Sequence, residues 1–339
     1  MGIDVSIVLP CRNEEKSVGS CIIAIREVMN SLDYSYEIIV SDSSSDSSPK
    51  IAKKTGVRVI KHDKVGYGNA LIEGFKAAKG QILVMGDCDN TYNFYELSRF
   101  LNAIKSADFV IGSRFKGEIK RGAMPFFHRY LGNPLLTFLL RLFFHTNISD
   151  AHSGFRAIKK DAYEQLGLKT TGMEFASEMI IKALKKGLKI KEVSISYNHR
   201  VGFSKMRSIR DGWKHLRFML LFSPMYLFFI PSLFMLFGGI VPFFKSNFLR
   251  LVLIVCGYQV FMLGLFAKTY AITKLEEKNR LVESVINNIS IEKGIFISVL
   301  ILLFAFVLQS ELVFSVLLLI SILTFFNVFF LSIIGIGEK

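Results

Sequence analysis

Hydrophobic and polar positions divide this chain into two parts. Up to about residue 220, short apolar runs alternate with segments that carry apolar residues at helical spacing. Beyond residue 223 the chain is largely apolar, with Phe and Leu predominating. The first pattern is typical of an α/β domain and the second of membrane-crossing helices. We therefore expect a soluble domain joined to a membrane domain.

The first part is predicted to alternate strands with helices. Strands are expected at residues 5–9, 37–40, 57–60, 82–85, 109–112 and 189–197. Helices are expected at residues 14–29, 48–54, 69–79, 94–105 and 174–186. This order favours a mostly parallel, doubly wound sheet. Ligands of such sheets collect at the carboxyl ends of the strands.

Residues 81–89, QILVMGDCD, mark the expected site at that edge. An apolar run leads into a glycine and then into Asp87 and Asp89, one residue apart. Mg²⁺ is typically held by one or two carboxylates together with substrate phosphate oxygens. The motif therefore predicts a site for a cation and a diphosphate, although an Asp-rich turn explains these residues equally well when they are taken alone.

Residues 124–144 are apolar enough to resemble a membrane span, but polar residues interrupt them at steps of four. These residues are Arg129, Asn133, Thr137 and Arg141. The spacing brings them close to one face of a helix. It predicts an amphipathic helix in the membrane interface, with the polar stripe turned toward the first domain. A true span is the alternative, and burial of two arginines disfavours it by about 3 kcal/mol per charge.

Four membrane spans are predicted in the second part. Residues 224–244 and 248–272 each have about the length that crosses a bilayer. The apolar stretch 294–335 is too long for one helix, and Gln309-Ser310-Glu311 interrupts it. We therefore expect two spans in this stretch, joined by a tight polar turn.

Basic residues indicate the topology and the domain boundaries. Residues 206–222 carry several Lys and Arg side chains and Trp213, as juxtamembrane amphipathic helices do. The positive charges of residues 274–293 place this segment and the first domain in the cytoplasm, although Lys245 and Arg250 on the opposite loop weaken the bias. The predicted domains are residues 1–205, 206–222 and 223–339.

Composition narrows the partners. The 339 residues carry a net charge of +14, and the basic residues cluster near the membrane segments. This distribution favours anionic lipid head groups and phosphorylated substrates over nucleic acid. The four cysteines show no CxxC pair, which fits a reducing compartment, and no signal peptide precedes the first strand. The six histidines show no ligand spacing, and most are expected to be ordinary surface or interface residues.

Seven motifs in order resemble the family 2 glycosyltransferases of GT-A fold. They are VSIVLPCRNEE, VSDSSSDSS, GYGNAL, GDCD, GSR, SDAHSGFRAI and RVGFSK, within about residues 3–222. The chain is most similar to the dolichyl- or polyprenyl-phosphate sugar synthases. The resemblance implies a Rossmann-like GT-A domain with interfacial helices, followed by an all-α transmembrane domain. It also implies an inverting, metal-dependent enzyme that moves a sugar from a nucleotide diphosphate sugar to dolichyl or polyprenyl phosphate.

The resemblance also assigns site residues. The donor nucleotide is expected at Pro10, Arg12, Asn13, Glu14, Asp42, Gly68, Asp87, Cys88 and Asp89. Mg²⁺ or Mn²⁺ is expected at Asp87, Asp89 and Thr91, and the diphosphate at Arg200, Ser204 and Lys205. The acceptor phosphate is expected at Arg114, Arg129, Asn133, Asp150 and Ser153. The expected catalytic residues are Asp87, Asp89, Arg114, Arg200 and Lys205.

Two departures from the family pattern leave the donor open. Thr91 stands where mannose synthases tend to have a glutamine that helps bind the metal, and SDSSSD replaces the usual DDGSxD. The segments RGAMP, SDAHSGFRAI and GMEFASEM look closer to the glucose-type synthases. We therefore expect UDP-glucose, with GDP-mannose as the alternative donor. A processive polysaccharide synthase and an inactive membrane scaffold are the alternative functions.

No general base is expected. The candidates are Asp150, Glu174 and Glu178, and nothing in the sequence indicates a raised pKa for any of them. A hydroxyl acceptor needs such a base, whereas a phosphate monoester is already mostly ionised at pH 7.

Overall fold

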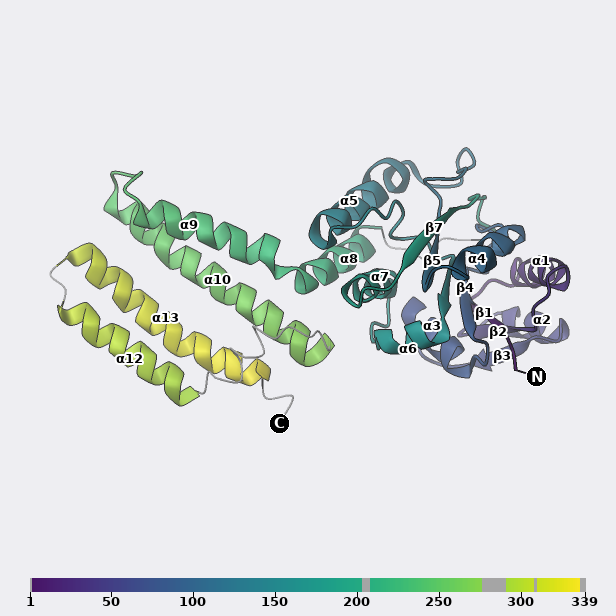
Figure 1. The fold of residues 1–339 in the computed structure, drawn as a ribbon, viewed down its shortest axis with the longest axis horizontal. Coiled ribbons are helices and arrows are strands. Elements are labelled where there is room, and N and C mark those ends of the chain that lie inside the picture. Colours follow the sequence, from purple (N-terminus) through teal and green to yellow (C-terminus); the bar gives the residue numbers. More distant parts are fainter. Residues whose placement is uncertain (1, 203–207, 276–290, 308–309, 336–339) are drawn as a thin grey trace. The chain divides into compact units, whose positions relative to one another are not determined.

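The structure is a computed structural model that describes residues 2–202, 208–275, 291–307 and 310–335 (Figure 1). The chain forms two compact units, Met1–Met219 and Leu220–Lys339. The first unit is built on one sheet, and the described part of the second unit is helical.

Seven strands form the sheet of the first unit, in the order β3-β2-β1-β4-β6-β5-β7. They are β1 (Val5–Cys11), β2 (Tyr36–Asp42), β3 (Arg58–Lys61), β4 (Ile82–Met85), β5 (Phe109–Ser113), β6 (Arg156–Lys159) and β7 (Ile190–Ser194). β6 runs antiparallel to its neighbours β4 and β5, and the other pairs are parallel. The predicted mostly parallel sheet is confirmed.

Helices cover both faces of this sheet. The first unit contains α1 (Val18–Asn30), α2 (Ser48–Lys54), α3 (Tyr67–Ala77), α4 (Leu97–Ile104), α5 (Asn133–Phe144), α6 (Lys160–Leu166), α7 (Phe175–Lys185) and most of α8 (Ser208–Phe222). Helix α1 contacts α2 and α4, whereas α3 contacts α7, which contacts α6. Two helical layers thus enclose the sheet, as the nearly continuous apolar sequence of its central strands requires.

Side chains of β1 point alternately to the two faces of the sheet, and each face packs against a different layer of helices. Ile7 and Leu9 belong to the core that α1 completes, whereas Val8 faces α3. A Cβ atom on Gly74 of α3 would lie 2.3 Å from Val8 Cγ1. Glycine at this position therefore lets α3 lie directly on the strand. Burying each of these β1 side chains contributes about 1.5–3 kcal/mol.

The predicted amphipathic helix is present but begins later and changes register. It starts with a π-helical turn, η2 (His128–Gly132), which closes with a hydrogen bond from Asn133 N–H to His128 O, and continues as α5. Thr137 is buried against the loop before β6, where its hydroxyl accepts from the Ala151 N–H at 3.4 Å, as the stripe predicted, whereas Arg141 is exposed. Each step of four residues turns about 40° past a full turn, so the stripe leaves the buried face before Arg141.

The opposite face of η2 and α5 is apolar and exposed. Phe126 is 79% exposed, and Tyr130, Leu135 and Phe138 are each about half exposed. Exposed apolar side chains gathered on one helix face fit the predicted position in a membrane interface.

The second unit contains α9 (Ile230–Ile240), α10 (Asn247–Leu275), α12 (Ile291–Val307) and α13 (Glu311–Gly335), with a π-helical turn at Met225–Phe229. Asn247–Thr273 and Glu311–Ile334 are long and apolar enough to cross a membrane. Helix α10 contacts α9 and α13, and Tyr258 donates to or accepts from Thr324 at 2.7 Å between α10 and α13. The four-span arrangement stays a prediction, because α9 and α12 are shorter and Gln309 lies outside the described residues.

Candidate active site

The aspartate pair lies directly after β4, at the carboxyl edge of the sheet. Asp89 is buried, and its Oδ1 accepts hydrogen bonds from the Thr91 backbone N–H at 3.0 Å and the Thr91 hydroxyl at 2.5 Å. Asp87 accepts a hydrogen bond from the Tyr67 hydroxyl. Burial and the charge of Asp89 raise the pKa of Asp87 to about 7. Two carboxylates that repel each other in this way form a place where a cation is stabilised.

Arg200 bridges two loops over this pair. Its Nη1 lies 3.1 Å from Asp89 Oδ2, and its Nη2 donates to Glu14 Oε1 at 2.7 Å. Its Nε is buried and has no hydrogen-bond partner among the described residues. The RVGFSK segment thus brings the Arg200 cation to the aspartate pair, and the expected role of Arg200 at the diphosphate stays a prediction. Ser204 and Lys205 lie outside the described residues.

A first cavity of about 340 Å³ opens beside the aspartate pair. The predicted donor residues that line it are Pro10, Arg12, Glu14, Asp87, Cys88 and Asp89. Asn13 and Gly68 instead shape its walls. Asn13 has a left-handed φ of 55° and its Oδ1 accepts from Ser45 N–H at 2.9 Å, and Gly68 donates to Gly172 O at 3.2 Å.

Asp42 is the most unusual residue at this edge. It ends β2, it is fully buried, and neither carboxylate oxygen has a hydrogen-bond partner among the described residues. The next residue, Ser43, lines the first cavity. A buried carboxylate without partners is costly. Asp42 itself is not among the described residues that line the first cavity, so its expected contact with the donor nucleotide stays a prediction.

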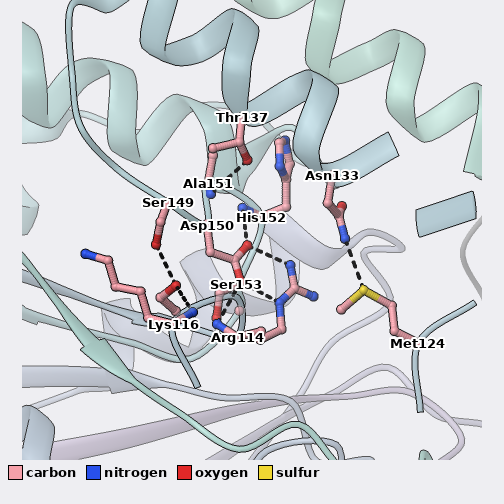
Figure 2. Close-up of polar contacts among 12 residues, drawn as sticks. Arg114, Lys116, Met124, Asn133, Thr137, Ser149, Asp150, Ala151, His152 and Ser153 are labelled. Carbon is pink, nitrogen blue, oxygen red and sulfur yellow. Dashed lines mark hydrogen bonds and ion pairs between the residues drawn. The ribbon is translucent and has the colours of Figure 1, made fainter. Parts of the chain in front are cut away.

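Arg114 and Asp150 form a buried ion pair (Figure 2). Arg114 directly follows β5, and Asp150 lies in the loop between α5 and β6. Arg114 Nε donates to Asp150 Oδ2 at 2.7 Å, and its Nη2 donates to Oδ1 at 2.8 Å. The Arg114 backbone N–H also donates to Oδ2 at 3.0 Å. This bidentate geometry fixes the guanidinium plane. Asp150 therefore orients Arg114 and offsets much of its charge.

A second cavity of about 640 Å³ shares Asp87 and Asp89 with the first. Its walls are largely apolar, with leucines of η2 and α5 and Trp213 and Leu216 of α8. Arg114 and Asn133, two of the residues expected to bind the acceptor phosphate, line it. Arg129 is not among the described residues that line it, and its Nη1 donates to Ile119 O at 3.4 Å. The two cavities meet at the aspartate pair.

Comparison with known proteins identifies this architecture. Residues 6–167 match the family model of Glycosyl transferase family 2. Dolichyl-phosphate hexose transferase of Haloferax volcanii is 32% identical over 213 residues, 62% of this chain and 89% of its own. The chain belongs to glycosyl transferase family 2. Low-salt glycan biosynthesis hexosyltransferase Agl6 of the same organism is 45% identical over 229 residues, which cover 67% of this chain but only 55% of Agl6.

A solved structure extends the family assignment to the fold. Glucosyl-3-phosphoglycerate synthase from Mycobacterium tuberculosis, in complex with Mn²⁺, UDP and glucosyl-3-phosphoglycerate, matches with a TM-score of 0.53. The match covers 66% of this chain and 81% of that chain at 21% identity. This likeness confirms the predicted GT-A fold for the family 2 unit.

Two of the base candidates in this family 2 chain have structural partners. Glu178 is fully buried, and its carboxylate accepts hydrogen bonds from Lys169 and Thr170 and lies 2.9 Å from Lys182 Nζ. It therefore holds the loop beside the N-terminus of α3. Asp150 is bound to Arg114. Glu174 keeps one buried oxygen, Oε2, without a partner among the described residues.

The sequence did not indicate the role of the histidines or of α8. Four of the six histidines line the second cavity, namely His128, His152, His199 and His215. Asp211 and Lys214 of α8 line the first cavity. The expectation that most histidines are ordinary surface or interface residues stays a prediction, but the sequence did not indicate that four of them line one cavity. His152 lies inside a motif already singled out, SDAHSGFRAI, but His215 carries no local signal because only packing brings α8 to the site.

Proposed function

We propose that this family 2 chain transfers a hexose, with inversion, from a nucleoside diphosphate sugar to a polyprenyl phosphate of the dolichyl class at the cytoplasmic membrane face. The observation that carries the proposal is the pair of cavities that meet at Asp87 and Asp89. One cavity is lined by strand-end loops of the sheet, and the other by apolar side chains that suit a lipid. The dolichyl-phosphate hexose transferase relative supports this acceptor class.

The first cavity has the groups that a nucleotide requires. The unpaired Asp42 carboxylate directly precedes the cavity residue Ser43, and we assign to it the N–H groups of a base. Arg200 reaches the aspartate pair and is suited to bind the diphosphate through its planar fork. As negative charge develops on the departing diphosphate, this cation stabilises it. UDP-glucose is the first donor to test, and GDP-mannose is the alternative.

The aspartate pair fits Mg²⁺ or Mn²⁺. Carboxylate oxygens are the ligands these hard cations prefer, and the mutual repulsion that raises the pKa of Asp87 is relieved when a cation binds. Among the described residues no third His, Cys, Asp or Glu completes a metal cluster, so phosphate oxygens and water would supply the other ligands. A bound ion would neutralise charge on the leaving diphosphate.

The acceptor side needs orientation rather than a base. Arg114, held by Asp150, and Asn133 present donors to the second cavity for the acceptor phosphate. The phosphate is mostly ionised at pH 7 and can attack the anomeric carbon without losing a proton to the protein. The commitment of Asp150 and Glu178 to structural partners supports this mechanism.

The test is a transfer assay with the purified chain in lipid vesicles. Radiolabelled UDP-glucose and GDP-mannose are supplied separately with a polyprenyl phosphate and Mg²⁺ or Mn²⁺. We expect label in an acid-labile lipid product with one donor, and a free nucleoside diphosphate in equal amount. Label that elongates a polysaccharide would favour a processive synthase, and no product with any donor would favour an inactive scaffold.

A further inference from the structure

His152 is a group in the second cavity that the proposed mechanism does not use. Its half-buried side chain lines the cavity, yet neither ring nitrogen has a hydrogen-bond partner among the described residues. The loop that carries it is rigidly held, because Asp150 binds Arg114 and the backbone N–H of Gly154 donates to the Tyr92 hydroxyl at 2.6 Å. The two ring nitrogens are buried, and leaving them without hydrogen-bond partners is energetically unfavourable. A ligand in the cavity would supply the missing partner.

The same loop touches the aspartate pair. A Cβ atom on Gly154, two residues after His152, would lie 3.0 Å from Asp87 Oδ2 and 2.8 Å from the Tyr67 hydroxyl. Asp87 and Asp89 are also the point where the two cavities meet. A diphosphate bound at this pair would direct its sugar into the junction. His152 lines the second cavity, so it would lie beside a sugar that enters this junction.

The surroundings of His152 favour a hydroxyl as its partner. The His215 ring meets the His152 ring edge to face at 4.6 Å, and His215 Nδ1 lies 2.7 Å from Ser177 Oγ, which fixes its orientation. Burial lowers the pKa of His152 well below its ordinary value, and electrostatic interaction with His215 and Arg114 lowers it further. A neutral imidazole offers one donor and one acceptor. A hydroxyl group also has one donor and can accept, so it can pair with either ring nitrogen. A phosphate is an anionic acceptor, and the guanidinium of Arg114 suits it better than a neutral imidazole does.

We propose that His152 is a specificity residue that hydrogen-bonds one hydroxyl group of the transferred hexose, with Ser177 and His215 as its positioning pair. The inference rests on the proposed function, because it requires a nucleotide sugar at Asp87 and Asp89. It assigns to this chain a side chain that distinguishes hexoses by the presence or orientation of a single hydroxyl. Such discrimination is strong when the site has a buried polar group to leave unpaired.

The experiment compares sugar donors that differ by one hydroxyl. The purified full-length chain receives the nucleotide hexose that the wild type transfers, and that donor's 2-, 3-, 4- and 6-deoxy analogues. For each, kcat/KM is measured with saturating polyprenyl phosphate. At one position we expect the wild type to prefer the parent sugar by a factor on the order of a hundred. His152→Ala should reduce that factor to about ten or less and leave the other three ratios unchanged.

Conservative and control variants separate recognition from folding. His152→Asn and His152→Gln each keep one donor near Nδ1 or Nε2, so one of them should retain part of the discrimination. His128→Ala removes another imidazole of the same cavity and should not change the deoxy-sugar ratios. Unchanged ratios in all three His152 variants, or a change confined to the KM of the lipid acceptor, would overturn the inference. A wild type that transfers none of the sugars would instead refute the proposed function itself.

Discussion

The two cavities that meet at Asp87 and Asp89 are built in different ways. The first lies at the ends of β1, β2 and β4, which are neighbours in a parallel sheet. The second is closed by η2, α5, α8 and the loop before β6, which are far apart in the sequence. Strand order brings together the residues of the first cavity that follow β1, β2 and β4, whereas Asp211 and Lys214 of α8 and most of the second cavity depend on how helices and loops pack. The difference separates what a sequence pattern can predict from what it cannot.

The largest expected effect is at the point the cavities share. Asp89→Ala should reduce transfer by a factor on the order of a hundred or more, because it removes a carboxylate suited to the cation that stabilises the leaving group. Asp63→Ala, an exposed aspartate, is the matched control. Steady-state transfer with and without EDTA measures the effect. Full activity of Asp89→Ala in EDTA would contradict the metal assignment.

A smaller effect should be confined to the first cavity. Asp42→Asn keeps the shape of the side chain but removes the unpaired buried charge. We expect the KM for the nucleotide sugar to rise by about tenfold, and the protein without ligand to gain about 1 kcal/mol of stability. Calorimetry and donor titrations measure both. A loss of stability in the ligand-free protein would show that Asp42 has a structural partner instead.

Substitutions in the second cavity should change the KM for the acceptor and not the KM for the donor. Asn133→Ala should raise the KM for the polyprenyl phosphate several-fold and leave the donor KM unchanged, because Asn133 lines this cavity. Arg129→Ala should have the smaller effect, since its guanidinium contacts Ile119 O and the Tyr130 ring. If Arg129→Ala has the larger effect on the acceptor KM, the proposed boundary of the second cavity is wrong.

A further effect, on stability and not on transfer, concerns pH and the aspartate pair. The pKa of Asp87 is raised to about 7 from an ordinary value near 3.8, so between these values the folded protein binds more protons than the unfolded one. Its stability should therefore fall as pH rises from about 4 to about 7. Thermal unfolding in EDTA should show this fall in the wild type and less of it in Asp87→Asn. Added Mg²⁺ should remove the difference at pH 8.

The sequence predicted most of the sheet and the first cavity for one reason. Parallel strands end at a common edge, so the residues after β1, β2 and β4 must meet there. It also singled out Arg114 and Asn133 as acceptor-side residues, and both line the second cavity. It could not show that Asp150 binds Arg114, because the two residues are 36 positions apart. They meet only because β6 pairs antiparallel with β5, which brings the loop before β6 to the end of β5.

The acceptor side shows the limit of periodicity. A stripe at steps of four assumes a regular α-helix, but η2 has π-helical geometry and α5 turns Arg141 away from the buried face. The histidines of the second cavity come from η2, the loop before β6, the loop after β7 and α8. Their spacing in sequence is irregular, and only the packing of η2, α8 and these two loops around one cavity brings them together.

The most direct test of the account is to fill the second cavity and measure the Michaelis constants of both substrates. Leu136 of α5 lines this cavity, whereas Leu142 lies on the same helix, is 44% exposed and is not among the described lining residues. Leu136→Trp should raise the KM for polyprenyl phosphate by about tenfold or more and leave the KM for the nucleotide sugar unchanged. Leu142→Trp should change neither. A rise in the nucleotide-sugar KM alone for Leu136→Trp would contradict the division of the site into a donor cavity and a lipid acceptor cavity.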